Sequence, residues 1–165
     1  MTPDELDRLR AASRDVVARA RRHAHPGLAI EAIGFRARAA ARKWPMTDRK
    51  VDWDWTRITK RTEVRRIDAA FWVDETLCGL AYGKITTHGP ALTRLEGAPG
   101  EHVLKGHITD LAIAVLETLA AALGSTRTML EDPDPDLIAW YGLRGYLPVA
   151  DPELSRYLAK ERAAR

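Results

Sequence analysis

The sequence predicts a single α/β domain (α+β in a stricter classification), with a mixed, mainly antiparallel central sheet flanked by helices. Three observations lead to this fold class. The chain has 165 residues, the usual length of one domain. Near its middle, two runs rich in β-branched and aromatic residues follow one another closely enough to form a hairpin. A long amphipathic helical pattern then lies between further strands. We therefore expect residues 1–165 to fold as one domain.

The chain is expected to open with two basic helices, which together occupy residues 1–45. Thr2 and Glu5 have the spacing of a capping box, and Pro3 stands at the first helical position. A second helix is expected from the apolar spacing between Leu28 and Ala41. The apolar stripe of the first helix consists of Leu6, Leu9, Val16, Val17 and Ala20.

The segment from Lys50 to Arg66 fits two interpretations. Trp53 and Trp55 stand two residues apart, which suits either one face of a strand or a loop anchored by aromatic side chains. Periodicity does not separate these interpretations, so both stay open.

A β-hairpin is the clearest feature of the middle of the chain. Its strands are Ile67 to Val73 and Leu77 to Ile85, which the polar residues 74–76 separate. A third strand is expected from Ala91 to Glu96. It ends at Gly97-Ala98-Pro99-Gly100, a segment too rich in glycine and proline to continue a strand.

The best-defined helix of the chain follows. Apolar residues from Ile108 to Leu123 recur at helical spacing, and Gly124 stands where a C-terminal stop is expected. A short strand at Thr126 to Leu130 comes next, and then a helix that opens at Asp134-Pro135. The predicted order is hairpin, strand, helix, strand, helix, strand. Residues 156–165 are expected to form a charged, partly ordered terminal extension.

Charge is unevenly distributed along the chain. Residues 1–66 hold 17 Lys and Arg against 9 Asp and Glu, a net charge of +8. The whole chain has 26 and 23, so the other 99 residues carry 9 basic and 14 acidic side chains, a net charge of −5. The basic half suits either a surface that binds phosphate or an acidic partner, or an Arg-rich helix face exposed to solvent.

Several functional classes are not expected. The longest apolar stretch, Leu111 to Leu116, is too short to cross a membrane, and the N-terminus lacks the pattern of a secretory signal, which favours a cytoplasmic protein. Cys78 is the only cysteine and lies in an apolar run, so a buried and unreactive thiol is expected. The five histidines lack the spacing of a zinc finger or a metalloprotease, so no metal is predicted.

Tyr141, Gly145 and Tyr146 place a tyrosine four residues before a glycine-aromatic pair at the end of the last predicted helix. With the order of elements, this pattern resembles the GNAT acetyltransferases, over about Ile67 to Pro148. The resemblance implies acetyl-CoA as the acetyl donor and an amine, on a small molecule or a macromolecule, as the acceptor.

The resemblance also implies where the cofactor lies. The pantetheine is expected along the third strand, and the pyrophosphate at the start of the long helix, where free amides and the helix dipole attract an anion. Only Gly106 remains of the family's usual glycine pattern, and Lys105 and His107 have the charge to replace the missing backbone donors. The expected cofactor residues are Thr93, Arg94, Leu95, Glu96, Lys105, Gly106, His107 and Ile108.

Two residues are predicted to carry the chemistry. By resemblance, Tyr141 is the acid that protonates the departing thiolate. Glu96, at the end of the cofactor strand, is the candidate base, although a carboxylate that only makes loop hydrogen bonds fits the position equally well. An acidic run suits either amine binding or helix capping, and consists of Glu131, Asp132, Asp134 and Asp136.

A different class of function stays open beside the enzyme. In that alternative, the chain is a catalytically inactive scaffold that binds nucleic acid or a protein partner through its Arg-rich half and through Trp53 and Trp55. Nucleic-acid binding is less favoured than the acetyltransferase function. A homodimer is compatible with either.

Overall fold

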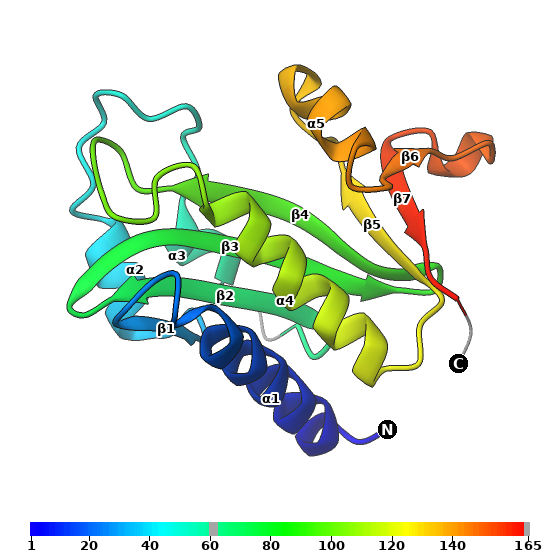
Figure 1. Cartoon of the computed structure of the whole chain (residues 1–165), viewed down its shortest axis with the longest axis horizontal. Coiled ribbons are helices and arrows are strands. Elements are labelled where there is room, and N and C mark those ends of the chain that lie inside the picture. Colours follow the sequence, from blue (N-terminus) through cyan, green and yellow to red (C-terminus); the bar gives the residue numbers. More distant parts are fainter. Residues whose placement is uncertain (60–62, 164–165) are drawn as a thin grey trace.

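The computed structural model describes residues 1–59 and 63–163, which form one mixed sheet with helices on both faces (Figure 1). Within this described part the sheet has seven strands in the order β1-β2-β3-β4-β5-β7-β6, and only β4 and β5 pair in parallel. The predicted fold class is confirmed. The strands are β1 (Leu28–Glu31), β2 (Arg66–Val73), β3 (Thr76–Thr86), β4 (Gly89–Gly97), β5 (Arg127–Glu131), β6 (Leu147–Pro148) and β7 (Tyr157–Glu161).

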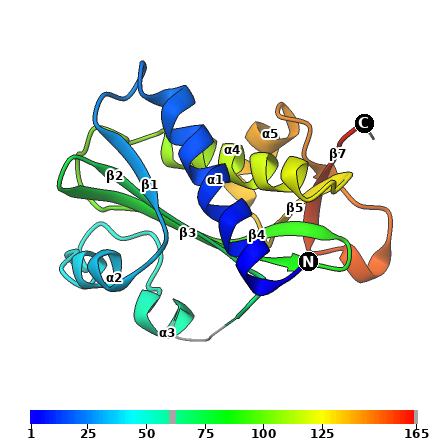
Figure 2. The same cartoon turned by 90° about the horizontal axis from the view of Figure 1, so that it is seen from below.

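The helices cover the two faces of the sheet separately. Figure 2 shows α1 and α4 together on one face, and α2 and α3 on the other. Side chains of β2 alternate accordingly, because Phe71 packs into the core under α1 and α4, whereas Trp72 packs with α2 and α3. The helices are α1 (Pro3–Arg21), α2 (Phe35–Ala41), α3 (Trp55–Thr59), α4 (Ile108–Ala122) and α5 (Ile138–Gly142), with short 3-10 turns η1 (Pro135–Leu137) and η2 (Pro152–Leu154).

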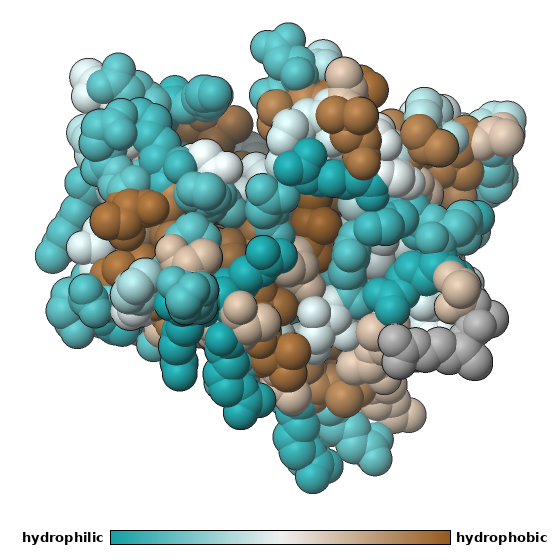
Figure 3. Space-filling view, in the orientation of Figure 1, coloured by the Kyte–Doolittle hydropathy of each residue, from teal (hydrophilic) through white to brown (hydrophobic). Residues whose placement is uncertain are grey.

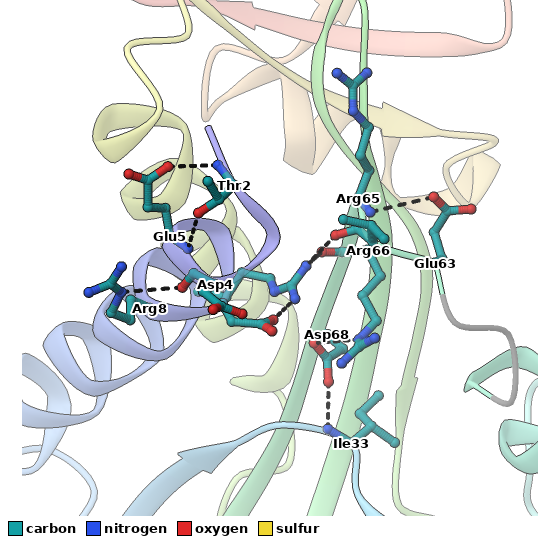
Figure 4. A network of polar contacts seen from close by, with 12 residues as sticks. Thr2, Asp4, Glu5, Arg8, Ile33, Glu63, Arg65, Arg66 and Asp68 are labelled. Carbon is teal, nitrogen blue, oxygen red and sulfur yellow. Dashed lines mark hydrogen bonds and ion pairs between the residues drawn. The ribbon is translucent and has the colours of Figure 1, made fainter.

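The capping box predicted for the first helix is present. The Thr2 hydroxyl accepts a bond from the Glu5 backbone N–H at 3.2 Å, and Thr2 N–H donates to the Glu5 carboxylate at 2.6 Å (Figure 4). Leu6 and Val17 of the predicted stripe are buried. Val16 and Ala20 are exposed instead, because the helix turns Arg10 toward the sheet.

The second predicted helix is wrong in its first part and confirmed in its second. Residues 28–31 form β1, which pairs antiparallel with β2, and the helix α2 begins later, at Phe35. Leu28 and Ile30 are both buried and lie two residues apart, so they fit the alternation of a strand as well as a helical stripe. The pairing with β2 makes this segment a strand and not the start of a helix.

In the described residues between α2 and β2, 42–59 and 63–65, the chain is irregular apart from the single turn of α3. Neither a strand nor a simple loop describes this segment fully, although the aromatic anchor is present. The rings of Trp53 and Trp55 meet edge to face with centroids 5.9 Å apart, and Trp55 is buried. Residues 60–62, which the predicted segment included, lie outside the described residues.

The middle of the chain follows the prediction. β2 and β3 form the expected hairpin, β4 follows, and α4 begins at Ile108 as its apolar spacing indicated. Gly124, just after α4, has φ +67, the left-handed conformation that a helix stop requires. The helix expected from Asp134 opens as η1 and continues as α5.

The C-terminal segment is not an extension. Residues 157–161 form β7, which lies between β5 and β6 and pairs with both. Leu158 and Ala159 are buried there, although charged neighbours surround them in the sequence. The end of this predicted segment, residues 164–165, lies outside the described residues.

Arginines of α1 attach it to the edge of β2. The pairing of β1 with β2 ends at Ala70, so the edge of β2 before it that faces away from β3 has no strand beside it among the described residues. Arg10 donates to the carbonyls of Val64 and Arg66, at 2.7 and 3.1 Å, and Arg14 donates to that of Asp68 at 3.0 Å. Part of the basic charge of the N-terminal half is therefore used inside the molecule.

Candidate functional site

The site begins where β4 and β5 separate. They pair at only two positions, Ala91 with Met129 and Leu92 with Leu130. Beyond them the edge of β4 from Thr93 to Gly97 has no strand beside it within the described chain, and a cavity of about 1080 Å³ lies there. Small-molecule sites commonly measure about 300–1,000 Å³. In Figure 3 the surface is hollowed between α5 and the body that carries β4.

A bulge turns the edge of β4 toward this cavity. Tyr82 and Gly83 of β3 pair with Arg94 and Leu92, so Thr93 is an extra residue on β4. Gly83 permits this close approach, because a Cβ at that position would lie 2.1 Å from the carbonyl oxygen of Ala91. The backbone of β4 is thus offered to the cavity at the point where β5 leaves it.

The fold brings the predicted site residues together, with one exception. The residues that line the cavity are Thr93, Arg94, Leu95, Glu96, Lys105, Gly106, Ile108 and Tyr141. The exception is His107, which lies outside the lining. Its ring contacts that of His25 after α1, with centroids 4.9 Å apart. Burial, and then the neighbouring His107, lower the pKa of His25. The side chain of His107 is thus directed toward α1.

The start of α4 is open to an anion. His107 is the N-cap residue, but its side chain makes no capping hydrogen bond. Its backbone N–H bonds to Leu104 O, and Leu111 is the next residue whose N–H bonds back, to His107 O. Gly106 has φ +81, which glycine adopts without strain, and this shapes the turn before the helix. The first-turn amides and the helix dipole therefore face the cavity mouth without a competing cap.

Lys105 is already paired in this turn. Its ammonium group bonds to the carboxylate of Glu101, four residues earlier, and both side chains are largely exposed. The contact with Lys105 lowers the pKa of Glu101. A bound anion would therefore compete with Glu101 for Lys105.

Tyr141 is a buried tyrosine that lines the cavity. It is 6% exposed, and its ring meets Trp140 edge to face at 5.2 Å. Burial, with the carboxylate of Asp134, raises its pKa above the ordinary phenol value. Because the pKa is raised, the hydroxyl is protonated at neutral pH, and the described residues give it no hydrogen-bond partner.

Glu96 has partners that the sequence did not indicate. Arg49 binds both carboxylate oxygens, at 2.7 and 3.0 Å, and the indole N–H of Trp55 donates to Oε2 at 2.5 Å. The hydrogen bond with Glu96 raises the pKa of Arg49. Arg49 lies 47 positions before Glu96, and no spacing or motif links the two residues.

His102 was also missed. It lines the cavity in the turn before α4, and burial lowers its pKa. Its imidazole is therefore neutral near pH 7 and has the chemistry to accept a proton. No spacing distinguished it from the other histidines.

The acidic run lies at the cavity but is largely used for structure. Glu131 bonds to the Tyr157 hydroxyl at 3.2 Å and lies 3.6 Å from Lys84, whereas Asp132 pairs with Arg156. The Asp134 side chain accepts a bond from Asp136 N–H at 2.9 Å and caps η1. These contacts favour the capping interpretation over amine binding.

Two kinds of feature are absent from the described residues. No group of three or more His, Cys, Asp or Glu side chains is arranged to hold a metal ion. No helix there has the length and apolar character needed to span a bilayer.

Comparisons with known proteins place the fold. No protein-family model matches the sequence, and no curated protein matches it significantly. Solved structures do match. The PaiA N-acetyltransferase from Thermoplasma acidophilum, in complex with coenzyme A, has a TM-score of 0.56 at 15% identity over 81% of this chain and 98% of that one.

Two other acetyltransferases match as well. The ribosomal-protein-S18-alanine N-acetyltransferase from Escherichia coli has a TM-score of 0.58 at 15% identity, over 84% of this chain and 96% of that one. Aminoglycoside 6'-acetyltransferase type Ii has a TM-score of 0.58 at 19% identity, over 82% and 98%. The agreement covers about four fifths of this chain. This chain therefore has the GNAT N-acetyltransferase fold.

Proposed function

We propose that the protein is an acetyl-CoA-dependent N-acetyltransferase that acts on an amine acceptor. The observation that carries the proposal is the separation of β4 from β5, with the free edge of β4 on one side of the cavity and the protonated Tyr141 lining it. The open N-terminus of α4 adds a place for a pyrophosphate. One structural neighbour is described in complex with coenzyme A, which supports the same donor here.

Acetyl-CoA would supply the acetyl group as a thioester, and this chain would hold and polarise it. Thr93 to Glu96 offer backbone groups to an extended pantetheine, and the first turn of α4 offers amides to the phosphates. The acceptor nitrogen forms the new bond to the acetyl carbon as the carbon–sulfur bond breaks. Tyr141 then gives its hydroxyl proton to the thiolate, and the neutral His102 is available to take the proton that the amine loses.

The Arg-rich half gives less support to a nucleic-acid scaffold. Arg10 and Arg14 point into the sheet edge, and Arg49 is bound to Glu96. Trp55, one of the two aromatic residues that such a surface would need, is 3% exposed. These side chains are not available to phosphates or bases.

Replacing Lys105 by Ala is expected to weaken acetyl-CoA binding by about 1–2 kcal/mol, because one charge-assisted bond to phosphate is lost. The wild-type affinity should also fall with added salt. Replacing Glu101 by Gln should have the opposite effect, since it removes the competing carboxylate and leaves Lys105 free. Isothermal titration calorimetry measures all three. Equal acetyl-CoA affinities in the wild type and the two variants would show that Lys105 does not bind the phosphates.

The function itself is tested with acetyl-CoA and a panel of amines. The neighbours' names suggest two acceptors to include, an aminoglycoside and a peptide with N-terminal alanine. We expect micromolar to millimolar binding of acetyl-CoA and release of CoA with at least one amine. Absence of binding heat and of a melting shift at about 1 mM acetyl-CoA would contradict the proposal.

A further inference from the structure

One wall of the cavity is an irregular segment, residues 46–53, between α2 and α3. Asp48, Lys50, Val51 and Trp53 of this segment line the cavity. The segment has no helix or strand to hold it, and Asp48 adopts φ +66. Its position therefore depends on side-chain contacts with the rest of the molecule.

Arg49 provides the main contact. Its guanidinium binds both oxygens of Glu96 and also reaches back to its own segment, donating to the carbonyl of Trp53 at 3.2 Å and to Met46 Sδ at 3.7 Å. The side chains of Arg49 and Glu96 are 9% and 4% exposed. A bidentate pair in such a place fixes orientation as well as distance.

Two tryptophans complete the attachment. Trp55 donates to the same carboxylate, and the ring of Trp53 lies 5.4 Å from the guanidinium of Arg94. Arg94 and Glu96 thus hold this wall on the α3 side of β4. Leu95, between them, packs into the core under α4 instead. The wall and the phosphate-binding turn of α4 consequently lie on opposite faces of the same strand.

We propose that Glu96 is a positioning residue, which together with Arg49 fixes residues 46–53 as the acceptor-side wall against the end of the cofactor strand. This inference rests on the proposed function for the identity of the acceptor side. Three hydrogen bonds engage both oxygens of the Glu96 carboxylate and fill three of its roughly four acceptor sites, which leaves little room for an acceptor's proton. Glu96 therefore acts through the wall it holds, and not on the acceptor's proton.

The attachment is tested first without any ligand. The variants are Arg49→Lys, which keeps the charge but loses the bidentate geometry, and Glu96→Gln. Arg42→Lys is the matched control, because the described residues give the Arg42 side chain a single, exposed contact, with Thr56 at 3.4 Å. Tryptic cleavage after Lys43 and Lys50 should become about tenfold faster in the two variants and stay unchanged in the control. The ¹⁵N–¹H resonance of the Trp55 indole should shift in Glu96→Gln.

The kinetic test separates positioning from proton transfer. With an amine that the wild type acetylates, Arg49→Lys should raise the KM for that amine about tenfold, with kcat and the acetyl-CoA affinity within about twofold of wild type. A loss of about 10²-fold in kcat in Glu96→Gln, with an altered pH profile and an unchanged KM, would instead make Glu96 the base.

Failure of this inference differs from failure of the proposed function. Unchanged cleavage and an unshifted Trp55 resonance would show that the pair does not hold the wall, whatever the enzyme does. If the wild type binds no acetyl-CoA, the proposed function fails. The wall then has no acceptor to face, and the positioning role of Glu96 fails with it, even if cleavage is faster in the variants.

Discussion

Replacing Tyr141 by Phe should lower the acetyl-transfer rate by about 10²–10⁴-fold, the usual contribution of a positioned acid. The ring and its contact with Trp140 are kept, and only the hydroxyl is lost. Because burial raises the pKa of Tyr141, the wild-type acid stays protonated as the pH rises, and the rate should not fall until above about pH 10. Steady-state kinetics with acetyl-CoA, from about pH 6 up to the ordinary phenol pKa of about 10, measures both effects.

Tyr146→Phe is the matched control. The Tyr146 hydroxyl is buried and bonds to Thr128 and Glu117, each at 3.1 Å, so its removal should cost about 1–2 kcal/mol of stability and leave the rate nearly unchanged. Tyr141→Phe should show the reverse pattern. A Tyr141→Phe protein that melts several degrees lower and keeps its rate would make Tyr141 a core residue with no catalytic part.

Replacing Asp68 by Ala should lower the free energy of unfolding by about 3–5 kcal/mol, the range for removing one partner of a buried ion pair. Asp68 is 4% exposed and accepts the Ile33 backbone N–H at 2.7 Å (Figure 4). It lies 3.6 Å from both Arg14 and Arg66. Without it, the largely buried Arg14 loses its counter-charge and an amide loses its acceptor. Urea unfolding measures the change.

Asp15→Ala provides the comparison. Its ion pair with Arg19 on α1 is exposed, at 2.9 Å, and such pairs contribute about 0–1 kcal/mol. Equal losses in the two variants would mean that the Asp68 contacts add nothing beyond a surface pair.

Local patterns in the sequence explain which elements could be predicted. The capping box of Thr2 and Glu5, the hairpin and the periodicity of α4 each depend on residues close together in the chain. β1 and β7 depend on partners far away, since β1 pairs with β2 across more than thirty positions, from Glu31 to Ala70. Short segments with mixed polarity have no periodicity strong enough to reveal such pairing.

The residues of the candidate site also fall into those that local patterns predict and those that depend on distant contacts. Tyr141 and the strand from Thr93 to Glu96 could be found because a local phrase and the order of elements point to them. The partner of Glu96 could not, because Arg49 stands in an irregular segment among many other arginines. The position of His107 likewise depends on a tertiary contact, with His25, that no spacing encodes.

The place of β7 determines when the sheet can be completed during synthesis. β5 pairs with β4 at only two positions, and β6 pairs with β7 alone among the described strands. β7 follows β5 and β6 in the chain, so their pairing with it must come after that of the part from β1 to β4. The side of the cavity that carries Tyr141 is therefore completed last. A growing chain therefore has β4 and the turn before α4 in place before it can complete the cavity.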